Sequence, residues 1–227
     1  MHVVTPGWNG KLGTGGRVWP GAVAMCQLLC SMSSSIAGSH ILELGTGTGA
    51  VGLYAGALGA SRVILTDGSD AEVELAGLNA RRHTHLFSPK ARVQASLHPW
   101  GEPLDPSITA EGFDFILGAD ITYSLSALPA LCDTLAVLGQ CGRHGKAPRM
   151  ILSHQGNRYG ESNIPEVLGL VAEGRGLRMK MLESAADISA PHVAFYEMHP
   201  LSLSSSAMSG EEQCKTDHRP CVTSQYT

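Results

Sequence analysis

Short apolar runs alternate along the chain with segments whose apolar residues recur every three or four positions. The apolar runs predict strands at 41–44, 63–66, 91–95, 113–120 and 150–153. The segments with helical period predict helices at 22–31, 50–58, 70–82, 128–138 and 165–173. Segments 33–39 and 140–148 lack such a period and are expected to be loops. Two final apolar runs, 177–182 and 192–198, have no helix between them and predict an antiparallel edge hairpin.

Strands that alternate with helices predict an α/β fold with a doubly wound, mostly parallel sheet. Three of the predicted strands carry an acidic residue at or near their carboxyl end, namely Glu43, Asp67 and Asp120. In such sheets the carboxyl ends of parallel strands meet at one edge, and ligands bind in the crevice outside it. We therefore expect these three acids to lie around a single ligand crevice.

A glycine-rich loop follows the first predicted strand. Glycines occupy Gly45, Gly47 and Gly49, and a helical segment begins at Ala50. Glycine allows a positive φ and a close approach of the backbone to a ligand, and the free N–H groups of a helix start attract anions. A ligand with a polar or anionic end is expected there. The loop also fits the dinucleotide fingerprint in its alanine form, and a plain tight turn is the third interpretation.

Two residues near this loop favour a nucleoside-containing ligand. Asp67 lies 22 residues after Gly45 in the chain, at the end of the next strand, where a carboxylate accepts hydrogen bonds from ribose hydroxyls. Its alternative role is to cap the helix that follows. Trp19 precedes Pro20 at a predicted helix start, and its indole suits either an adenine ring or a core wall.

The composition limits the class of protein. The chain has 227 residues, 43% of them hydrophobic and 16% charged, which fits one sizeable globular domain. A net charge of −4 without a basic block argues against nucleic acid as the main partner. No apolar run reaches 18 residues, so no membrane span is expected, and no signal peptide is recognised at the N-terminus.

The six cysteines and ten histidines show no metal-binding spacing, and no metal is predicted. Reduced thiols in a cytoplasmic or nuclear protein are expected. We expect a flexible arm over residues 1–16, one catalytic domain over 17–201, and a disordered tail over 202–227, which is rich in Ser, Thr and charge. The sequence predicts no oligomeric state.

Four segments together resemble one family. They are Val18-Trp19-Pro20, the run from Leu42 to Gly49, Trp100-Gly101, and Asp120-Ile121-Thr122-Tyr123. In this order and spacing, over roughly residues 17–200, the chain resembles the lysine methyltransferase-like branch of the class I S-adenosylmethionine (SAM) methyltransferases, called methyltransferase family 16. The resemblance implies a Rossmann-like, seven-stranded fold and SAM as cofactor. The chain departs from the family in its short segment before Trp19 and in Pro99, where an acidic or polar residue is usual.

The resemblance also implies roles for individual residues. The loop residues Glu43, Gly45, Thr46, Gly47 and Gly49 would line the methionine and ribose portions of SAM. Asp67 would hold the ribose diol, Trp100 would pack beside the adenine, Trp19 would close the pocket, and Ala119 would also contact the cofactor. Asp120 and Tyr123 would lie near the methyl group and the acceptor amine, and are the predicted catalytic residues.

A lysine acceptor must be neutral to accept a methyl group, and its ordinary pKa is about 10.4. We therefore expect Asp120 to orient the amine and bind its cationic form before the proton leaves to water. Tyr123 would wall the pocket by cation–π contact or bond to the cofactor. The alternatives are that Asp120 only caps a helix and that Tyr123 only packs.

The leading hypothesis is a SAM-dependent methyltransferase that acts on a protein lysine. The alternatives are a SAM enzyme with a small-molecule or other side-chain acceptor, a non-catalytic interaction module with this fold, and a nicotinamide dehydrogenase. The last rests only on the Gly45-x-Gly47-x-x-Ala50 spacing.

Overall fold

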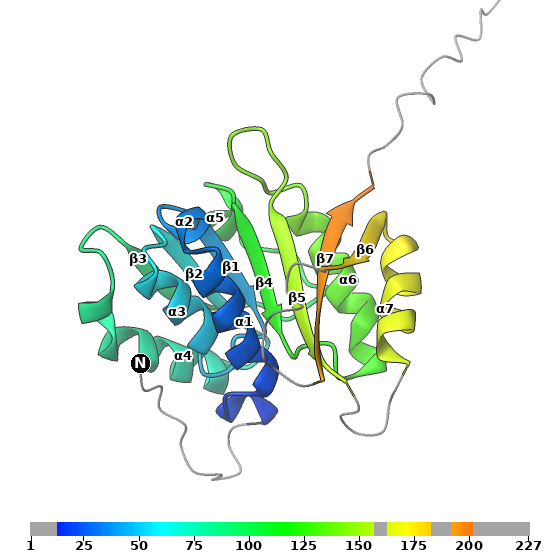
Figure 1. The fold of residues 1–227 in the computed structure, drawn as a ribbon, viewed down its shortest axis with the longest axis horizontal. Coiled ribbons are helices and arrows are strands. Elements are labelled where there is room, and N and C mark those ends of the chain that lie inside the picture. The colour runs from blue at the N-terminus through cyan, green and yellow to red at the C-terminus, as the bar shows by residue number, and fades with distance from the viewer. Residues whose placement is uncertain (1–12, 157–162, 183–191, 202–227) are drawn as a thin grey trace, which may run out of the picture.

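The computed structural model describes residues 13–156, 163–182 and 192–201. Its centre is one seven-stranded sheet with the strand order β3-β2-β1-β4-β5-β7-β6 (Figure 1). The strands are β1 (His40–Leu44), β2 (Arg62–Asp67), β3 (Arg92–Leu97), β4 (Phe115–Ala119), β5 (Arg149–Gln155), β6 (Leu177–Met181) and β7 (Val193–Pro200). Strands β1 to β5 are parallel, and β7 runs antiparallel to both β5 and β6. The predicted fold class and the C-terminal antiparallel hairpin are confirmed.

The register brings the predicted acids to one edge of the sheet. Strand β1 is buried along its whole length, and Glu43 pairs with Leu65 of β2 and Leu117 of β4. Asp67 ends β2, and Asp120 directly follows β4. The carboxyl ends of the three central strands therefore meet where the crevice was expected.

Helices cover both faces of the sheet. The helices are α1 (Pro20–Ser31), α2 (Ser33–Ile36), α3 (Ala50–Ala57), α4 (Asp70–Arg82), α5 (Pro106–Thr109), α6 (Leu128–Leu138) and α7 (Ile164–Glu173). Apolar residues of α1, α3 and α4 form one core with Ile41 of β1, whereas α5, α6 and α7 form the other core with Leu42. Successive residues of a strand point to opposite faces, so each strand contributes to both cores. Figure 1 shows the two helical layers on either side of the sheet.

Several short elements differ from the prediction. Residues 33–39, expected as a loop, include α2, and the prediction also missed α5 and the 3₁₀ helices Thr14–Gly16 (η1), Thr84–Leu86 (η2) and Leu125–Ala127 (η3). These elements are one turn long, too short to show a hydrophobic period. The predicted strand at 113–120 is shorter at both ends. Asp114 uses its carboxylate to accept a hydrogen bond from the His40 N–H at 2.8 Å, and Asp120 has a φ of 55°.

None of the helices in the described part of the chain is long and apolar enough to cross a membrane.

Candidate functional site

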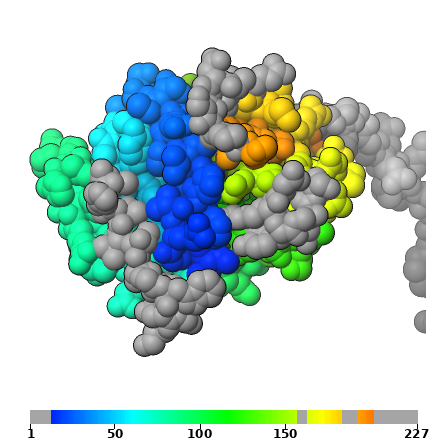
Figure 2. Space-filling view, turned by 60° about the horizontal axis from the view of Figure 1, so that its bottom comes forward, coloured from blue at the N-terminus to red at the C-terminus, as the bar shows by residue number. Residues whose placement is uncertain are grey.

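A cavity of about 540 Å³ lies at the carboxyl ends of the central strands. Its walls come from the loop after β1, the end of β2, the loops after β3 and β4, and the residues before α1. In Figure 2 the residues before α1 and the helix itself, in dark blue, run across this face of the molecule between the cyan α3 side and the yellow-green β5 side. The cavity is thus closed partly by a segment that precedes the first strand in the chain.

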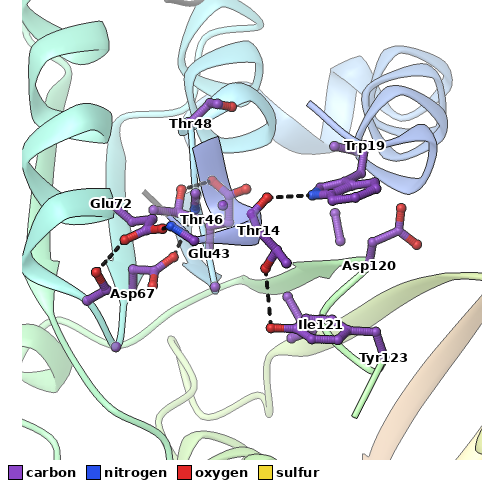
Figure 3. Close-up of a pocket in the computed structure, with 18 of the residues that line it drawn as sticks. Thr14, Trp19, Glu43, Thr46, Thr48, Asp67, Glu72, Asp120, Ile121 and Tyr123 are labelled. Atoms are coloured by element: carbon purple, nitrogen blue, oxygen red, sulfur yellow. Dashed lines mark hydrogen bonds between the residues drawn. The ribbon is translucent and has the colours of Figure 1, made fainter. Parts of the chain in front are cut away.

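The structure brings together nearly all the residues that the sequence predicted for the site. The lining residues include Trp19, Glu43, Gly45, Thr46, Gly47, Asp67, Trp100, Ala119, Asp120 and Tyr123. Gly49 does not line the cavity. It precedes α3 with a φ of 81°, so it shapes the turn rather than the wall. Figure 3 shows Trp19 beside Asp120 on one side of the cavity, and Asp67 and Glu72 on the other.

Close approach of other segments explains two of the loop glycines. A Cβ atom on Gly47 would lie 2.6 Å from the carbonyl oxygen of Gly15, and one on Gly45 would lie 2.6 Å from Cγ2 of Ile121. Both glycines also have a positive φ, 59° for Gly45 and 52° for Gly47. A side chain at either position would therefore strain the backbone and displace a wall of the cavity.

Glu43 is the most deeply buried acid of the site. Its Oε2 accepts a hydrogen bond from Thr46 Oγ1 at 2.7 Å (Figure 3). The same oxygen accepts one from the Gly52 N–H at 2.9 Å. Burial raises the pKa of Glu43 to about 7, although both hydrogen bonds favour its charged form. A buried acid that titrates near neutral pH is typical of functional sites.

Asp67 ties the end of β2 to the glycine loop. Its Oδ2 accepts a hydrogen bond from the Gly47 N–H at 2.9 Å. Burial raises the pKa of Asp67, and the Gly47 N–H opposes this rise. Helix α4 begins at Asp70, and Ser69 is its N-cap residue. The hydrogen bond to Gly47 holds the Asp67 carboxylate in the cavity wall beside the glycine loop.

Glu72 is a site residue that the sequence interpretation missed. It lies in the first turn of α4, is only 4% exposed, and lines the cavity. Its Oε1 accepts a hydrogen bond from the Gly13 N–H at 3.0 Å, and its Oε2 accepts one from Ser69 Oγ. The spacing Ser69-x-x-Glu72 is that of a helix capping box, a signal that could have placed Glu72 in the first turn of the helix that follows Asp67.

The segment before α1 crosses the mouth of the cavity. Trp19 Nε1 donates a hydrogen bond to the Thr14 carbonyl at 2.9 Å, and Thr14 Oγ1 donates one to the Tyr123 hydroxyl at 3.4 Å (Figure 3). Together with the bond from Gly13 to Glu72, these contacts connect α4 to the loop after β4. Gly13, Thr14 and Gly15, which belong to the arm predicted over 1–16, therefore line the cavity, and residues 1–12 lie outside the described residues.

Asp120 connects two further elements. Its Oδ2 accepts a hydrogen bond from the Gly21 N–H in α1, and its Oδ1 accepts one from the Gln155 N–H at the end of β5, both at 2.7 Å. The side chain is only 5% exposed, yet Asp120 lines the cavity. Its carboxylate thus holds the start of α1, next to Trp19, against the central sheet.

Trp100 lies in the loop after β3 and Tyr123 in the loop after β4, and both line the cavity. Tyr123 is 37% exposed, so its ring is accessible at the mouth. Trp100 is partly buried and packs against the core on the α6 face of the sheet. Among the described residues no group of three His, Cys, Asp or Glu side chains is placed to hold a metal ion. The groups that line the cavity are carboxylates, backbone groups and aromatic rings.

Comparison with known proteins places this geometry in a family. The sequence model of the family described as "Lysine methyltransferase" matches residues 8–163. The chain belongs to the lysine methyltransferase family. The resemblance inferred from the Trp-Pro, glycine-loop, Trp-Gly and Asp-x-x-Tyr motifs is thereby confirmed.

Two curated relatives show how far the similarity extends. The chain is 41% identical over 126 residues to protein N-lysine methyltransferase METTL21A of Danio rerio, covering 55% of this chain and 56% of that protein. It is 30% identical over 166 residues to EEF1A lysine methyltransferase 3 of Mus musculus, covering 72% of this chain and 68% of that protein. The chain thus spans between half and about two thirds of the length of these relatives.

A solved structure with this fold is magnesium protoporphyrin IX methyltransferase of Synechocystis PCC 6803 with bound SAM. It shares 17% identity and a TM-score of 0.52 with the chain, covering 78% of this chain and 79% of that one. This likeness supports the fold of the lysine methyltransferase domain.

Proposed function

We propose that the protein is a SAM-dependent methyltransferase that transfers a methyl group to a lysine side chain of another protein. The family match over residues 8–163 carries this proposal. The cavity supports it, because the residues of all four family motifs contribute to its lining. The dehydrogenase alternative has no comparable support, since it rests on the glycine spacing alone.

The residues present fit a nucleoside linked to an amino acid. Asp67 offers a carboxylate for the ribose hydroxyls, and Trp100 with Pro99 gives an apolar wall for the adenine. Glu43 and the backbone of Gly45 and Gly47 lie beside the start of α3, where the polar amino-acid end fits. SAM would supply an electrophilic methyl group on its positively charged sulfur.

The chain's own residues would position and deprotonate the acceptor. Tyr123 at the mouth provides an aromatic face for a lysine side chain. Asp120 already accepts two backbone N–H bonds, but a carboxylate has about four acceptor sites, so it can also orient an amine in the cavity. Burial of the amine and the nearby positive charge on the sulfur of SAM would lower the pKa of the amine, and Asp120 opposes this shift while it orients the amine. The amine then releases its proton to water before transfer.

We propose a protein as the substrate, and the name of the mouse relative contains a protein that can be tested. That relative is called an EEF1A lysine methyltransferase, so EEF1A is a first acceptor to try. We propose a cytoplasmic or nuclear location, with neither nucleic acid nor a membrane as the main partner. The support for this is the net charge of −4 and the absence of a basic block or a long apolar run in the sequence.

The first experiment is a calorimetric titration of the full chain with S-adenosylhomocysteine, with NADH as the control ligand. We expect micromolar binding of S-adenosylhomocysteine and none of NADH. Asp67→Ala should weaken binding at least about tenfold, because the ribose loses its bonds to the half-buried carboxylate. Asp70→Ala is the matched control, since Asp70 is exposed and lies outside the cavity.

The second experiment adds methyl-labelled SAM to the chain together with EEF1A or a cell extract, and locates labelled residues by mass spectrometry. Label on lysine is the expected result. Binding of S-adenosylhomocysteine with label only on small molecules would replace the lysine acceptor by the small-molecule alternative. No binding by folded protein would favour the non-catalytic interaction module.

A further inference from the structure

Arg17 is the one basic side chain among the described residues that line the cavity. Four carboxylic acids line it as well, namely Glu43, Asp67, Glu72 and Asp120. The side chain of Arg17 is exposed, and among the described residues no carboxylate forms an ion pair with it. The acid-lined cavity thus has a cation at its rim that can bind an anion from outside the described chain.

A neighbouring aromatic ring holds this cation in place. The Arg17 guanidinium lies over the indole of Trp19, 4.2 Å from the ring centroid. The indole is itself fixed, because its Nε1 donates to the Thr14 carbonyl at 2.9 Å. A guanidinium that stacks by its face on an aromatic ring keeps the N–H donors of its edge for a carboxylate, which it can bind with two parallel hydrogen bonds.

We infer that Arg17 selects protein substrates in which an Asp or Glu lies beside the acceptor lysine. This inference rests on the proposed function. Trp19 and Tyr123 both line the cavity, and Thr14 forms a hydrogen bond with each of them. A substrate lysine that enters the cavity beside these rings brings its neighbouring residues to Arg17. A lysine with basic neighbours is repelled there, whereas one with an acidic neighbour gains a charge-assisted pair.

The exposure of Arg17 favours a protein carboxylate over the carboxylate of the cofactor. Glu43 is 2% exposed and Thr46 is 5% exposed, so these two residues beside the glycine loop are buried. Arg17 lies instead on the open side, in the segment that leads into α1. A residue in this position contacts the surface of an incoming protein.

The test compares the parent chain with Arg17→Gln, Arg17→Glu and the control Arg178→Gln, which changes an exposed arginine on β6, outside the cavity. Each variant is incubated with cell extract and methyl-labelled SAM, and labelled lysines are located by mass spectrometry. Lysines with an acidic neighbour should dominate with the parent chain and the control. Arg17→Gln should label them about tenfold less, and Arg17→Glu should shift labelling to lysines with basic neighbours.

Calorimetry on the same variants gives a second readout. Each of the two ligands, S-adenosylhomocysteine and 5′-methylthioadenosine, should bind with the same dissociation constant to all four proteins. Unchanged lysine selection by Arg17→Glu overturns the inference. It is equally overturned if Arg17→Gln binds S-adenosylhomocysteine tenfold more weakly but 5′-methylthioadenosine normally, because Arg17 then holds the carboxylate of the cofactor. A parent chain that binds no S-adenosylhomocysteine, or labels no lysine, instead contradicts the proposed function on which the inference depends.

Discussion

Glu43 makes the stability of the fold depend on pH. Burial raises its pKa from 4.5 to about 7, so the folded chain holds a proton that the unfolded chain releases between these values. The contribution of Glu43 to the free energy of unfolding should therefore be greatest below pH 4.5. This contribution should fall as the pH rises to about 7. The shift corresponds to about 3 kcal/mol.

Urea denaturation at pH 5 and pH 8 measures this effect. In Glu43→Gln the decline between the two pH values should shrink by about 2–3 kcal/mol, because the amide has no proton to lose. Glu74→Gln on the exposed side of α4 is the control and should keep the full decline. An equal decline in Glu43→Gln and the parent would show that Glu43 is charged in the fold at pH 5.

Asp120 combines a structural role with the predicted catalytic one. The sequence alone suggests that its substitution would spare the fold, but its carboxylate accepts the N–H groups of Gly21 and Gln155. In Asp120→Asn one of these N–H groups faces an amide donor instead of an oxygen. Stability should fall by about 1–3 kcal/mol, and methyl transfer should be lost as well.

Denaturation and transfer assays on the same Asp120→Asn sample separate the two roles. The transfer assay is run at a temperature where the variant is fully folded. Asp133→Asn is the control, because Asp133 carries an exposed ion pair with Arg175. Folded Asp120→Asn with normal transfer would leave Asp120 with a structural role only.

At the scale of elements, η1 holds the cavity mouth through contacts that a small change can break. A Cβ atom on Gly15 would lie 2.6 Å from Cγ of Glu72 and 3.2 Å from Cα of Gly47, whereas one on Gly13 would lie 3.5 Å from Glu72 Oε1. Gly15→Ala should push η1 away from the glycine loop, and Gly13→Ala should be accommodated. None of the residues of η1 is buried, so the melting temperature should change little in either variant.

We expect Gly15→Ala to bind S-adenosylhomocysteine at least about fivefold more weakly than the parent, because one wall of the cavity moves. Calorimetry on Gly15→Ala, Gly13→Ala and the parent tests this. Equal affinities in all three would show that η1 does not contribute to the cofactor pocket.

For the whole molecule, the hydrophobic pattern was sufficient to predict the strands of the sheet and the edge at which the candidate site lies. The acids at the ends of β1, β2 and β4 follow from local sequence because parallel strands of one sheet end at the same edge. The contacts of Asp120 could not be predicted in this way. Its partners, Gly21 and Gln155, lie 99 and 35 residues away in the chain, and only the folded structure brings them together.

The same limit explains the missed wall of the cavity. Glu72 bonds to Gly13, 59 residues before it, and Thr14 bonds to Tyr123, 109 residues after it. Residues 12–16 are rich in glycine and have no apolar period, so the sequence predicts a flexible arm there. The contacts of this segment with Glu72 and Trp19 use the Gly13 N–H and the Thr14 C=O, which are backbone groups that every such residue carries and no sequence pattern reveals.

The boundary at residue 201 is a prediction for the molecule as a whole. Strand β7 ends at Pro200, and the Leu201 N–H donates a hydrogen bond to the Gly176 carbonyl at 2.7 Å, which closes the hairpin of β6 and β7. A chain that ends after Leu201 keeps this bond and every described element. It should therefore melt within about 2 °C of the full chain and bind S-adenosylhomocysteine equally well, because a 1 kcal/mol loss lowers the melting temperature of a domain of this size by about 2–4 °C. Thermal denaturation and calorimetry on both chains provide the comparison, and a chain that ends after Val193 is the destabilised control. A clear fall in melting temperature on removal of 202–227 would show that these residues pack on the domain and belong to it.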